Sequence, residues 1–414
     1  MLDKAGLIVR WLLCGLVLVF PFSVAASNAL LGTVLGLGML CGMWRDGILR
    51  MWADYRSLSL AMLAYWGLMA IGLLWSSDRA WGLQVLGHQW FWLAVPVLVV
   101  ALNDALWRTR LLMLLSLSLT AHLVFCVLQM FGYVSIADFG GSNAEDATGY
   151  IGHIGFGFVY GIWAGWLLHR GWYLHGLQRA AVWLLASWAW VMIFAAQGRS
   201  GYLVAVAMLA IVLWRQLVRV GWSGVGWKAW GLPLGLLVVM GGLLATGPGK
   251  ERMLVTLHEV SAMWSGEVGH ANPRWTMWII SVEAWLEHPV LGVGTGGFPQ
   301  AAAGILDKQP LLKSGALAGH IPSHPHNMYM LSLARWGLVG LAAFMVLVVL
   351  WMRSGWRLVW GEGLESPLLV LSGLALAIDA CFAPTIEQHG TGVLLVLMLA
   401  LGLASGKPLK PTGA

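Results

Sequence analysis

The chain has 414 residues, of which 59% are hydrophobic and only 10% are charged. Soluble domains carry about 25% charged residues, so this composition excludes an ordinary soluble enzyme. It indicates a polytopic, α-helical membrane protein with a single membrane domain. The formal net charge of +6 would suggest an anionic partner in a soluble protein. In a membrane protein such charges are first assigned to the two sides of the bilayer, and we predict no nucleic-acid partner.

The four cysteines, Cys14, Cys41, Cys126 and Cys381, all fall inside apolar segments. Their spacing matches neither a metal site nor an extracellular disulfide framework. We therefore expect free, packed thiols, and we predict neither a metal nor a cofactor.

A membrane-spanning helix needs about 20 mostly apolar residues. The first 29 residues are similar to a signal peptide, but another apolar stretch follows almost at once, so a retained first helix is favoured. We expect roughly twelve spans with short links and no internal repeat, near 6–25, 27–44, 57–75, 85–103, 111–132, 151–169, 180–197, 201–218, 229–246, 328–352, 367–384 and 391–406.

The lysines and arginines of the short links give the expected orientation. Most of them lie on one side of these spans, and the short links of the other side hold only Arg79 and Arg199. Because cytoplasmic links are enriched in Lys and Arg, both termini are expected in the cytoplasm. The chain then divides into nine transmembrane helices (1–246), a periplasmic loop region (247–327), and three further transmembrane helices with a short cytoplasmic tail (328–414).

The long outer interval, 247–326, contains a predicted helix that ends before Pro289. Asn272 is a good N-cap, and Pro273 suits the first helical position because it has no N–H to satisfy. Arg274 lies in the first turn, where exposed N–H groups and the helix dipole favour an anion. The glycines of 291–297 predict a tight turn. Apolar residues recur at helical spacing, so we expect the helix to lie on or between the spanning helices with one apolar face, made of Trp275, Trp278, Ile279, Val282, Trp285 and Leu286.

Two arginines are candidates for binding an anion. Arg199 lies in the shortest outer link, 197–201, and opens a helix whose N-terminus faces outside. The alternative is an ordinary interfacial arginine whose side chain extends to the membrane surface, and Arg274 has the comparable alternative of a solvated residue at a helix start. Together the two form a candidate clamp for a diphosphate, because a guanidinium group binds phosphate oxygens at two points.

Histidines supply the candidate general base. His326 precedes a spanning helix on the outer face, and a neutral imidazole can accept a proton from a hydroxyl group; the alternative is that it only caps the helix. His324 points elsewhere if the segment is extended, and no nearby carboxylate or cysteine completes a metal site with the pair. His153, His122 and His88 are lone histidines in or near spans, and we expect them to be packed.

Two charged residues lie within expected spans. Asp379 is about 9 Å below the outer end of its span, at about 1.5 Å per residue. A carboxylate there is normally paired or functional, so we expect it to pair with an arginine or histidine of the site. Arg335 is expected to be a packing or pairing residue. The outer interval holds no paired acidic motif for a catalytic metal, and two arginines with one histidine are chemically sufficient to neutralise a leaving diphosphate and accept a proton.

Taken in order, several short motifs resemble the O-antigen ligase and polymerase superfamily over about a third of the chain, from residue 197 to 340. These are the segment 197–201, Arg274-Trp275 with Trp278, His288-Pro289-Val290-Leu291-Gly292-Val293-Gly294, His326-Asn327-Met328-Tyr329 and the segment 333–340. The length of the chain and its outer interval of about eighty residues look most like the lipopolysaccharide O-antigen ligases. One departure is that many relatives have an acidic residue where this chain has Arg335.

The resemblance implies metal-independent transfer of a glycan from undecaprenyl diphosphate to the sugar core of lipid A, on the periplasmic side of the bacterial inner membrane. In this family the matching arginines, here Arg199 and Arg274, bind the donor diphosphate, and the matching histidine, here His326, activates the acceptor. Asp379 carries a supporting role less directly. We place Asn327, Tyr329 and His324 beside the site as further supporting residues.

Three alternatives remain open at this point. An O-antigen polymerase uses another lipid-linked glycan as acceptor. A protein O-oligosaccharyltransferase is usually longer, with an added C-terminal region. A lipid-linked glycan transporter, from a different class, needs cationic residues in both leaflets, whereas the intramembrane charges here gather toward the outer side. All of these would contact membrane lipids.

Overall fold

The computed structural model describes residues 2–136, 142–196, 198–224, 273–309, 312–313, 317–356, 358–361 and 363–406, with isolated residues between 235 and 261. All regular elements in these ranges are helices, which confirms the expected all-α class. The longer helices are α1 (Leu2–Val19), α2 (Val24–Leu40), α3 (Met43–Asp54), α4 (Arg56–Ile71), α5 (Arg79–Gly87), α6 (Val95–Ala101), α7 (Ala105–Met130), α8 (Gly152–Gly171), α9 (Gly176–Ala195), α10 (Arg199–Gly224), α13 (Pro273–Glu287), α14 (Phe298–Lys308), α16 (Met328–Trp356), α17 (Leu368–Asp379) and α18 (His389–Ser405). Three short 3-10 helices accompany them, η1 (Trp90–Ala94), η2 (Gly149–Ile151) and η3 (Leu358–Trp360).

Six helical stretches of the described chain are long and apolar enough to cross a membrane, and a seventh is added if α2 and α3 form one broken span. The protein is therefore multi-pass, whereas the expected number of roughly twelve spans stays a prediction. α4, α17 and α18 are apolar but shorter than 18 residues. The span expected at 229–246 falls almost entirely outside the described residues.

Local sequence explains where several helices begin and bend. The Ser23 hydroxyl accepts a hydrogen bond from the Ala26 N–H at 3.2 Å and caps α2, as expected for serine at this position. Gly42 has a φ of 77°, in the left-handed region that glycine enters easily. The chain consequently turns by 85° between α2 and α3, so the expected span 27–44 corresponds to most of α2 and the bend that follows it.

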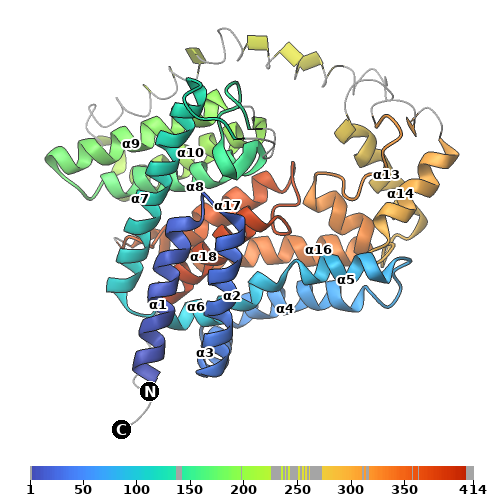
Figure 1. The fold of residues 1–414 in the computed structure, drawn as a ribbon, viewed down its shortest axis with the longest axis horizontal. Coiled ribbons are helices and arrows are strands. Elements are labelled where there is room, and N and C mark those ends of the chain that lie inside the picture. Colours follow the sequence, from blue (N-terminus) through green and yellow to red (C-terminus); the bar gives the residue numbers. More distant parts are fainter. Residues whose placement is uncertain are drawn as a thin grey trace.

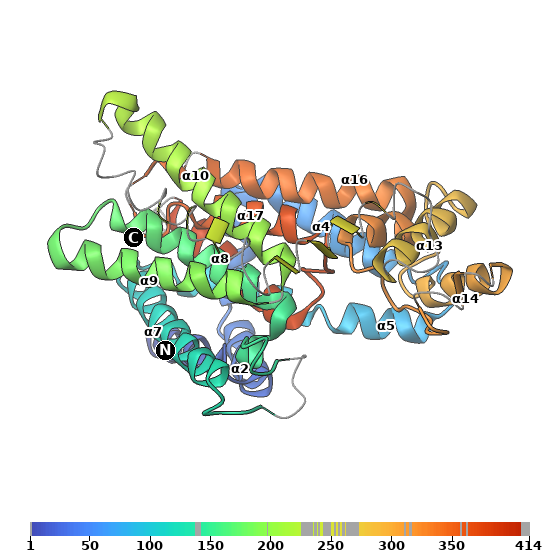
Figure 2. The same ribbon diagram turned by 90° about the horizontal axis from the view of Figure 1, so that it is seen from above.

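The core of the molecule is built around α17 and α18. On α18 every residue from Thr391 to Ala404 is buried, as expected for a helix that is hydrophobic all round. Figure 1 shows α17 and α18 in the middle, with α8, α9 and α10 on one side and α13 and α14 on the other, and Figure 2 shows the same separation. A Cβ on Gly157 of α8 would overlap the Cα of Gly201 of α10; paired glycines let these helices approach closely, as small residues do in membrane proteins.

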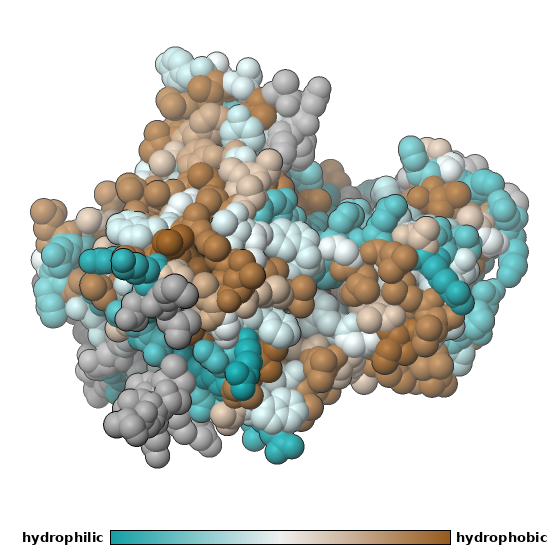
Figure 3. Space-filling model, turned by 60° about the horizontal axis from the view of Figure 1, so that its bottom comes forward, coloured by the Kyte–Doolittle hydropathy of each residue, from teal (hydrophilic) through white to brown (hydrophobic). Residues whose placement is uncertain are grey.

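The outer surface is rich in apolar side chains. Leu40 is 85% exposed, Leu63 65% and Leu117 61%. Figure 3 shows hydrophobic residues over large parts of one face, with hydrophilic residues between them. Apolar surface on this scale marks contact with lipid or partners rather than water, in agreement with the candidate spans.

The glycine-rich turn after α13, residues 289–294, is hydrogen-bonded to α16 at a point where that helix is interrupted. Within α16 the backbone leaves helical geometry at Trp336 and at Gly337, whose φ is 63° and ψ −153°, a combination that essentially only glycine adopts. The N–H of Gly294 donates to the carbonyl of Arg335 at 2.8 Å, and the N–H of Leu338 donates to the carbonyl of Pro289 at 2.9 Å. The predicted tight turn therefore exists, and it satisfies backbone groups that the broken helix leaves without intrahelical partners.

Candidate active site

The segment carrying His326 is fixed to α16 and to the end of α17. The Asn327 side-chain oxygen accepts the N–H of Met330 at 3.0 Å and so caps α16. The N–H of Met328 donates to the carbonyl of Ala380, just beyond α17, at 2.7 Å. Asn327 is 6% exposed, and in this structure it is a capping residue that sets the position of the histidine before it.

α13 holds the same segment from the other side. It begins at Pro273 and ends at Glu287, as the sequence predicts; the proposed N-cap, Asn272, lies outside the described residues. The Trp278 indole N–H donates to the carbonyl of Pro325 at 3.2 Å. Trp278, in the second turn of α13, therefore holds Pro325, the residue that precedes His326.

α13 buries a face of small and mixed side chains inside the protein. Its buried residues are Thr276, Met277, Ile280, Ser281 and Ala284. The tryptophan-rich face is half-buried, and Leu286 is exposed. The face of small and mixed side chains packs against the neighbouring helices, and α13 lies against the spanning helix α16, as expected. In a protein embedded in lipid, burial inside the protein and burial in an apolar medium select different faces.

His326 has an unusual backbone conformation. Its φ is 50°, in the left-handed region that is uncommon for residues other than glycine. Its N–H donates to His324 Nδ1 at 3.2 Å, and the two imidazole rings pack edge to face with centroids 4.4 Å apart. The segment is therefore folded back instead of extended, so the condition under which His324 would point elsewhere is not met, and the two rings are in contact. Such strain persists only where the surroundings enforce it, and it gathers at functional sites.

Both imidazoles favour the neutral form. Burial lowers the pKa of His326, and the nearby positive charges of Arg274 and His153 lower it further. Burial lowers the pKa of His324 to about 4, with smaller contributions from His326 and Arg335. At neutral pH the His326 ring is therefore unprotonated and can accept a proton.

Arg274 and Asp379 meet beside this histidine. Arg274, the second residue of α13, lies close enough to interact electrostatically with both His326 and Asp379. Asp379 is fully buried; its Oδ2 accepts the Thr385 hydroxyl at 2.8 Å, and Ser200 of α10 lies next to the carboxylate. The structure thus brings together an arginine, a histidine and a buried carboxylate that come from three different helices or their ends.

Arg199 is the first residue of α10 and is exposed. It is adjacent to Ser200, and on its other side the backbone of Gly198 touches the start of α8, because a Cβ on Gly198 would overlap the carbonyl oxygen of His153. The starts of α8, α10, α13 and α16 thus carry or follow His153, Arg199, Arg274 and His326. Helix N-termini have positive partial charge, so their N–H groups and these side chains all favour an anion.

Two further residues near His326 stabilise the fold. The Tyr329 hydroxyl donates to the carbonyl of Ala377 at 2.9 Å, which ties α16 to α17. Arg335 is 2% exposed, and its Nη1 lies 2.6 Å from Glu387 Oε1. Arg335 is therefore a buried pairing residue, as the sequence suggests.

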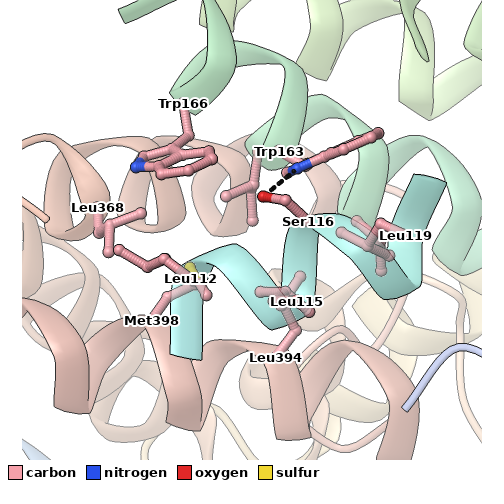
Figure 4. A pocket seen from close by; sticks show the side chains of 11 residues that line it. Leu112, Leu115, Ser116, Leu119, Trp163, Trp166, Leu368, Leu394 and Met398 are labelled. Atoms are coloured by element: carbon pink, nitrogen blue, oxygen red, sulfur yellow. Dashed lines mark hydrogen bonds between the residues drawn. The ribbon is translucent and has the colours of Figure 1, made fainter. Parts of the chain in front are cut away.

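An apolar pocket lies away from these residues, between α7, α8, α17 and α18 (Figure 4). Leucine, tryptophan and other apolar side chains line it. Its one hydroxyl, on Ser116, accepts the Trp163 indole N–H at 3.1 Å. With no titratable side chain in its lining, this pocket has no means of acid–base chemistry.

The remaining histidines divide into two kinds. His122 is fully buried, as expected, and its Nδ1 lies 2.9 Å from the Tyr160 hydroxyl. The expectation of packing was wrong for the other two: His88 is exposed, and the His153 side chain is 40% exposed and faces the site. The missed signal is its position, because His153 directly follows the start of α8, where a side chain reaches the interface. The four cysteines are free, as predicted.

A comparison with known protein families finds one match. Residues 180–345 match the model of a family described as O-antigen ligase. This segment is similar to the O-antigen ligase family. It contains Arg199, Arg274 and His326, and it ends within α16. No curated protein matches the chain significantly. The protein is thus a multi-pass membrane protein, and part of it is similar to a family whose members are membrane enzymes, either ligases or polymerases.

Proposed function

We propose that the protein is a glycosyltransferase that moves O-antigen polysaccharide from undecaprenyl diphosphate to the lipid A–core oligosaccharide, at the periplasmic face of the bacterial inner membrane. The observation that carries the proposal is the meeting of Arg274 and His326 inside the family-matched segment. A cation for the diphosphate and a neutral base for the acceptor are the two functions that this transfer needs.

In the proposed reaction the acceptor hydroxyl oxygen attacks the anomeric carbon of the donor sugar. The bond from that carbon to the diphosphate oxygen breaks, and its electron pair leaves with the diphosphate. The proton of the acceptor hydroxyl passes to the neutral imidazole of His326. Arg199 and Arg274 bind the diphosphate and neutralise its growing charge. A single displacement from the opposite side inverts the anomeric configuration.

The surroundings of the two central residues support these roles. The lowered pKa of His326 keeps its imidazole unprotonated, and Asp379 places a carboxylate near Arg274. Because the arginines supply the charge stabilisation, the proposal needs no metal, and transfer should persist in excess EDTA. Activity that disappears with the chelator and returns with Mg²⁺ or Mn²⁺ would contradict the arginine clamp.

The reactions of an O-antigen polymerase and a protein O-oligosaccharyltransferase share this chemistry and differ in the acceptor. The decisive experiment therefore offers purified protein the undecaprenyl-diphosphate-linked O-antigen together with lipid A–core, a second lipid-linked repeat unit or an acceptor protein. We expect covalent product with lipid A–core. Product only with the lipid-linked glycan would identify a polymerase, product only with protein would identify the oligosaccharyltransferase, and no covalent product with any acceptor would favour a transporter.

The same distinction is available in cells. Deleting a ligase leaves full-length polymer on the lipid carrier, whereas deleting a polymerase leaves single repeat units on the core. We expect the first pattern. Cysteine labelling at Gly269 from outside whole cells, in a background without native cysteines, tests the orientation. Labelling that requires a breached inner membrane would contradict a periplasmic site.

A further inference from the structure

A buried carboxylate and a half-exposed imidazole lie together at the start of α8. His153 is the second residue of α8, and its Nδ1 lies 3.8 Å from Asp146 Oδ2. The Asp146 side chain is 5% exposed, whereas that of His153 is 40% exposed. The carboxylate is therefore behind the ring, and the rest of the imidazole faces outward.

The loop that presents Asp146 is firmly built. The Asn143 side-chain oxygen accepts the N–H of Asp146 at 2.9 Å, and the N–H of Thr148 donates to the Asp146 carbonyl at 2.9 Å. Ser142 in turn accepts a hydrogen bond at 3.0 Å from Gln129 of α7, which is 1% exposed. A loop anchored in this way holds the carboxylate behind His153 in one position.

His153 also lies between the two parts of the candidate site. It is close enough to His326 to act on it electrostatically. On the other side, the His153 carbonyl oxygen occupies the space that a side chain at Gly198 would need. Arg199 is the next residue after Gly198, so it lies close to His153 as well. The amino ends of α8 and α10 are side by side there, and helix amino ends attract anions.

We propose that His153, oriented by Asp146, is a further binding residue for the diphosphate of the lipid-linked donor, next to Arg199. The carboxylate behind the ring orients the imidazole. When both ring nitrogens carry hydrogen, the outward N–H donates a charge-assisted hydrogen bond to a phosphate oxygen. Arg199 and His153 hold one side of the diphosphate, and Arg274 and His326 face it from α13 and α16. This inference rests on the proposed function, because it concerns the same donor.

The test measures binding of undecaprenyl diphosphate and transfer kinetics side by side for the purified protein and its variants. We expect His153→Ala to weaken binding by about tenfold to a hundredfold, the usual range for a lost hydrogen bond to a charged group. KM for the donor should rise while KM for the acceptor stays constant. Asp146→Asn should shift donor binding in the same direction by a smaller factor, because it removes only the orienting charge. If His153→Ala fails to fold, His153→Gln is measured in its place.

His175 provides a matched control. It is an exposed histidine at the N-cap of α9, so it also stands at a helix start but away from the site. Donor binding by the His153 variants equal to that of His175→Ala would overturn the inference, as would a change confined to acceptor KM. Failure of the wild-type protein to transfer any glycan would instead overturn the proposed function, so the two failures are distinguishable.

Discussion

The two ends of the same helices carry basic side chains in opposite electrostatic settings. On α8, His153 stands at the start and Arg170 in the last turn. On α16, His326 precedes the first turn and Arg353 lies in the last. Because a helix dipole is positive at its N-terminus and negative at its C-terminus, cations stabilise the C-terminal end and oppose the N-terminal one by about 0.3–1 kcal/mol each. Stabilisation of the helix dipole therefore does not explain why basic residues stand at these helix starts.

α10 shows the contrast most clearly. Arg199 is its first residue, and Arg215 lies sixteen residues further along, about 24 Å at 1.5 Å per residue. Arg215 is 1% exposed and donates to the carbonyls of Val359 and Gly361, the latter at 2.6 Å. It fastens the loop after α16. The comparison teaches that arginines far along these helices hold the fold together, while those at the starts gather where an anion would bind.

The largest effect on transfer is expected from His326. His326→Asn removes the base, and asparagine tolerates the left-handed backbone that the position requires, so the variant should fold. Transfer should fall by about 10² to 10⁴, the usual contribution of a positioned base, while donor binding persists. His324→Ala should lose much less, because its ring only accepts the backbone N–H of His326. Loss of donor binding without a separate defect in transfer would make His326 a donor ligand.

The pH dependence sharpens the same point. The pKa of His326 is lowered below that of a free histidine, and only the unprotonated ring accepts a proton. Transfer should therefore remain near its maximum down to below about pH 6.5 and fall as pH drops through the lowered pKa. The pH–rate profile of His326→Asn should lack this decline in transfer at low pH. If the variant shows the same decline at low pH, the decline belongs to the titration of another group.

A somewhat smaller effect is expected from the arginines. Arg199→Ala and Arg274→Ala should each reduce kcat/KM by about 100-fold, the loss typical of one donor that stabilises charge in the transition state. Lysine should restore little, because a single ammonium group cannot reproduce the two-point fork of a guanidinium. Turnover close to wild type in the lysine variants would reduce these residues to general surface cations.

The smallest effect on transfer is expected at the other end of α10. Arg215→Ala should lower the free energy of unfolding by about 1–3 kcal/mol. The substitution leaves the buried carbonyls of Val359 and Gly361 without their charged hydrogen-bond donor. Below the melting temperature its kcat/KM and donor affinity should stay within about twofold of the wild type. If Arg215→Ala lost as much donor binding as Arg274→Ala, the distinction between arginines at the helix starts and arginines further along the helices would be contradicted.

Several features of the site are local, and the sequence determines them. Pro273 sets the start of α13 and therefore puts Arg274 in its first turn, and Asn327 caps α16 directly after His326. The glycines at 292 and 294 specify a turn with positive φ. The apolar composition makes the chain a multi-pass helical protein. Each of these results depends on interactions within a few residues, which a sequence shows directly.

Only the tertiary structure decided how these pieces meet. Asp379 and Arg274 come from helices separated along the chain by α14 and α16. No sequence pattern around either residue predicts that the two lie close together. His153 looked like a packed histidine because its exposure depends on how α8 and α10 meet at Gly198, and on a loop that Gln129 of α7 holds in place. The partner of a buried charge and the accessible side of a membrane helix are set by long-range packing, because in lipid an apolar face has no preference between protein and membrane.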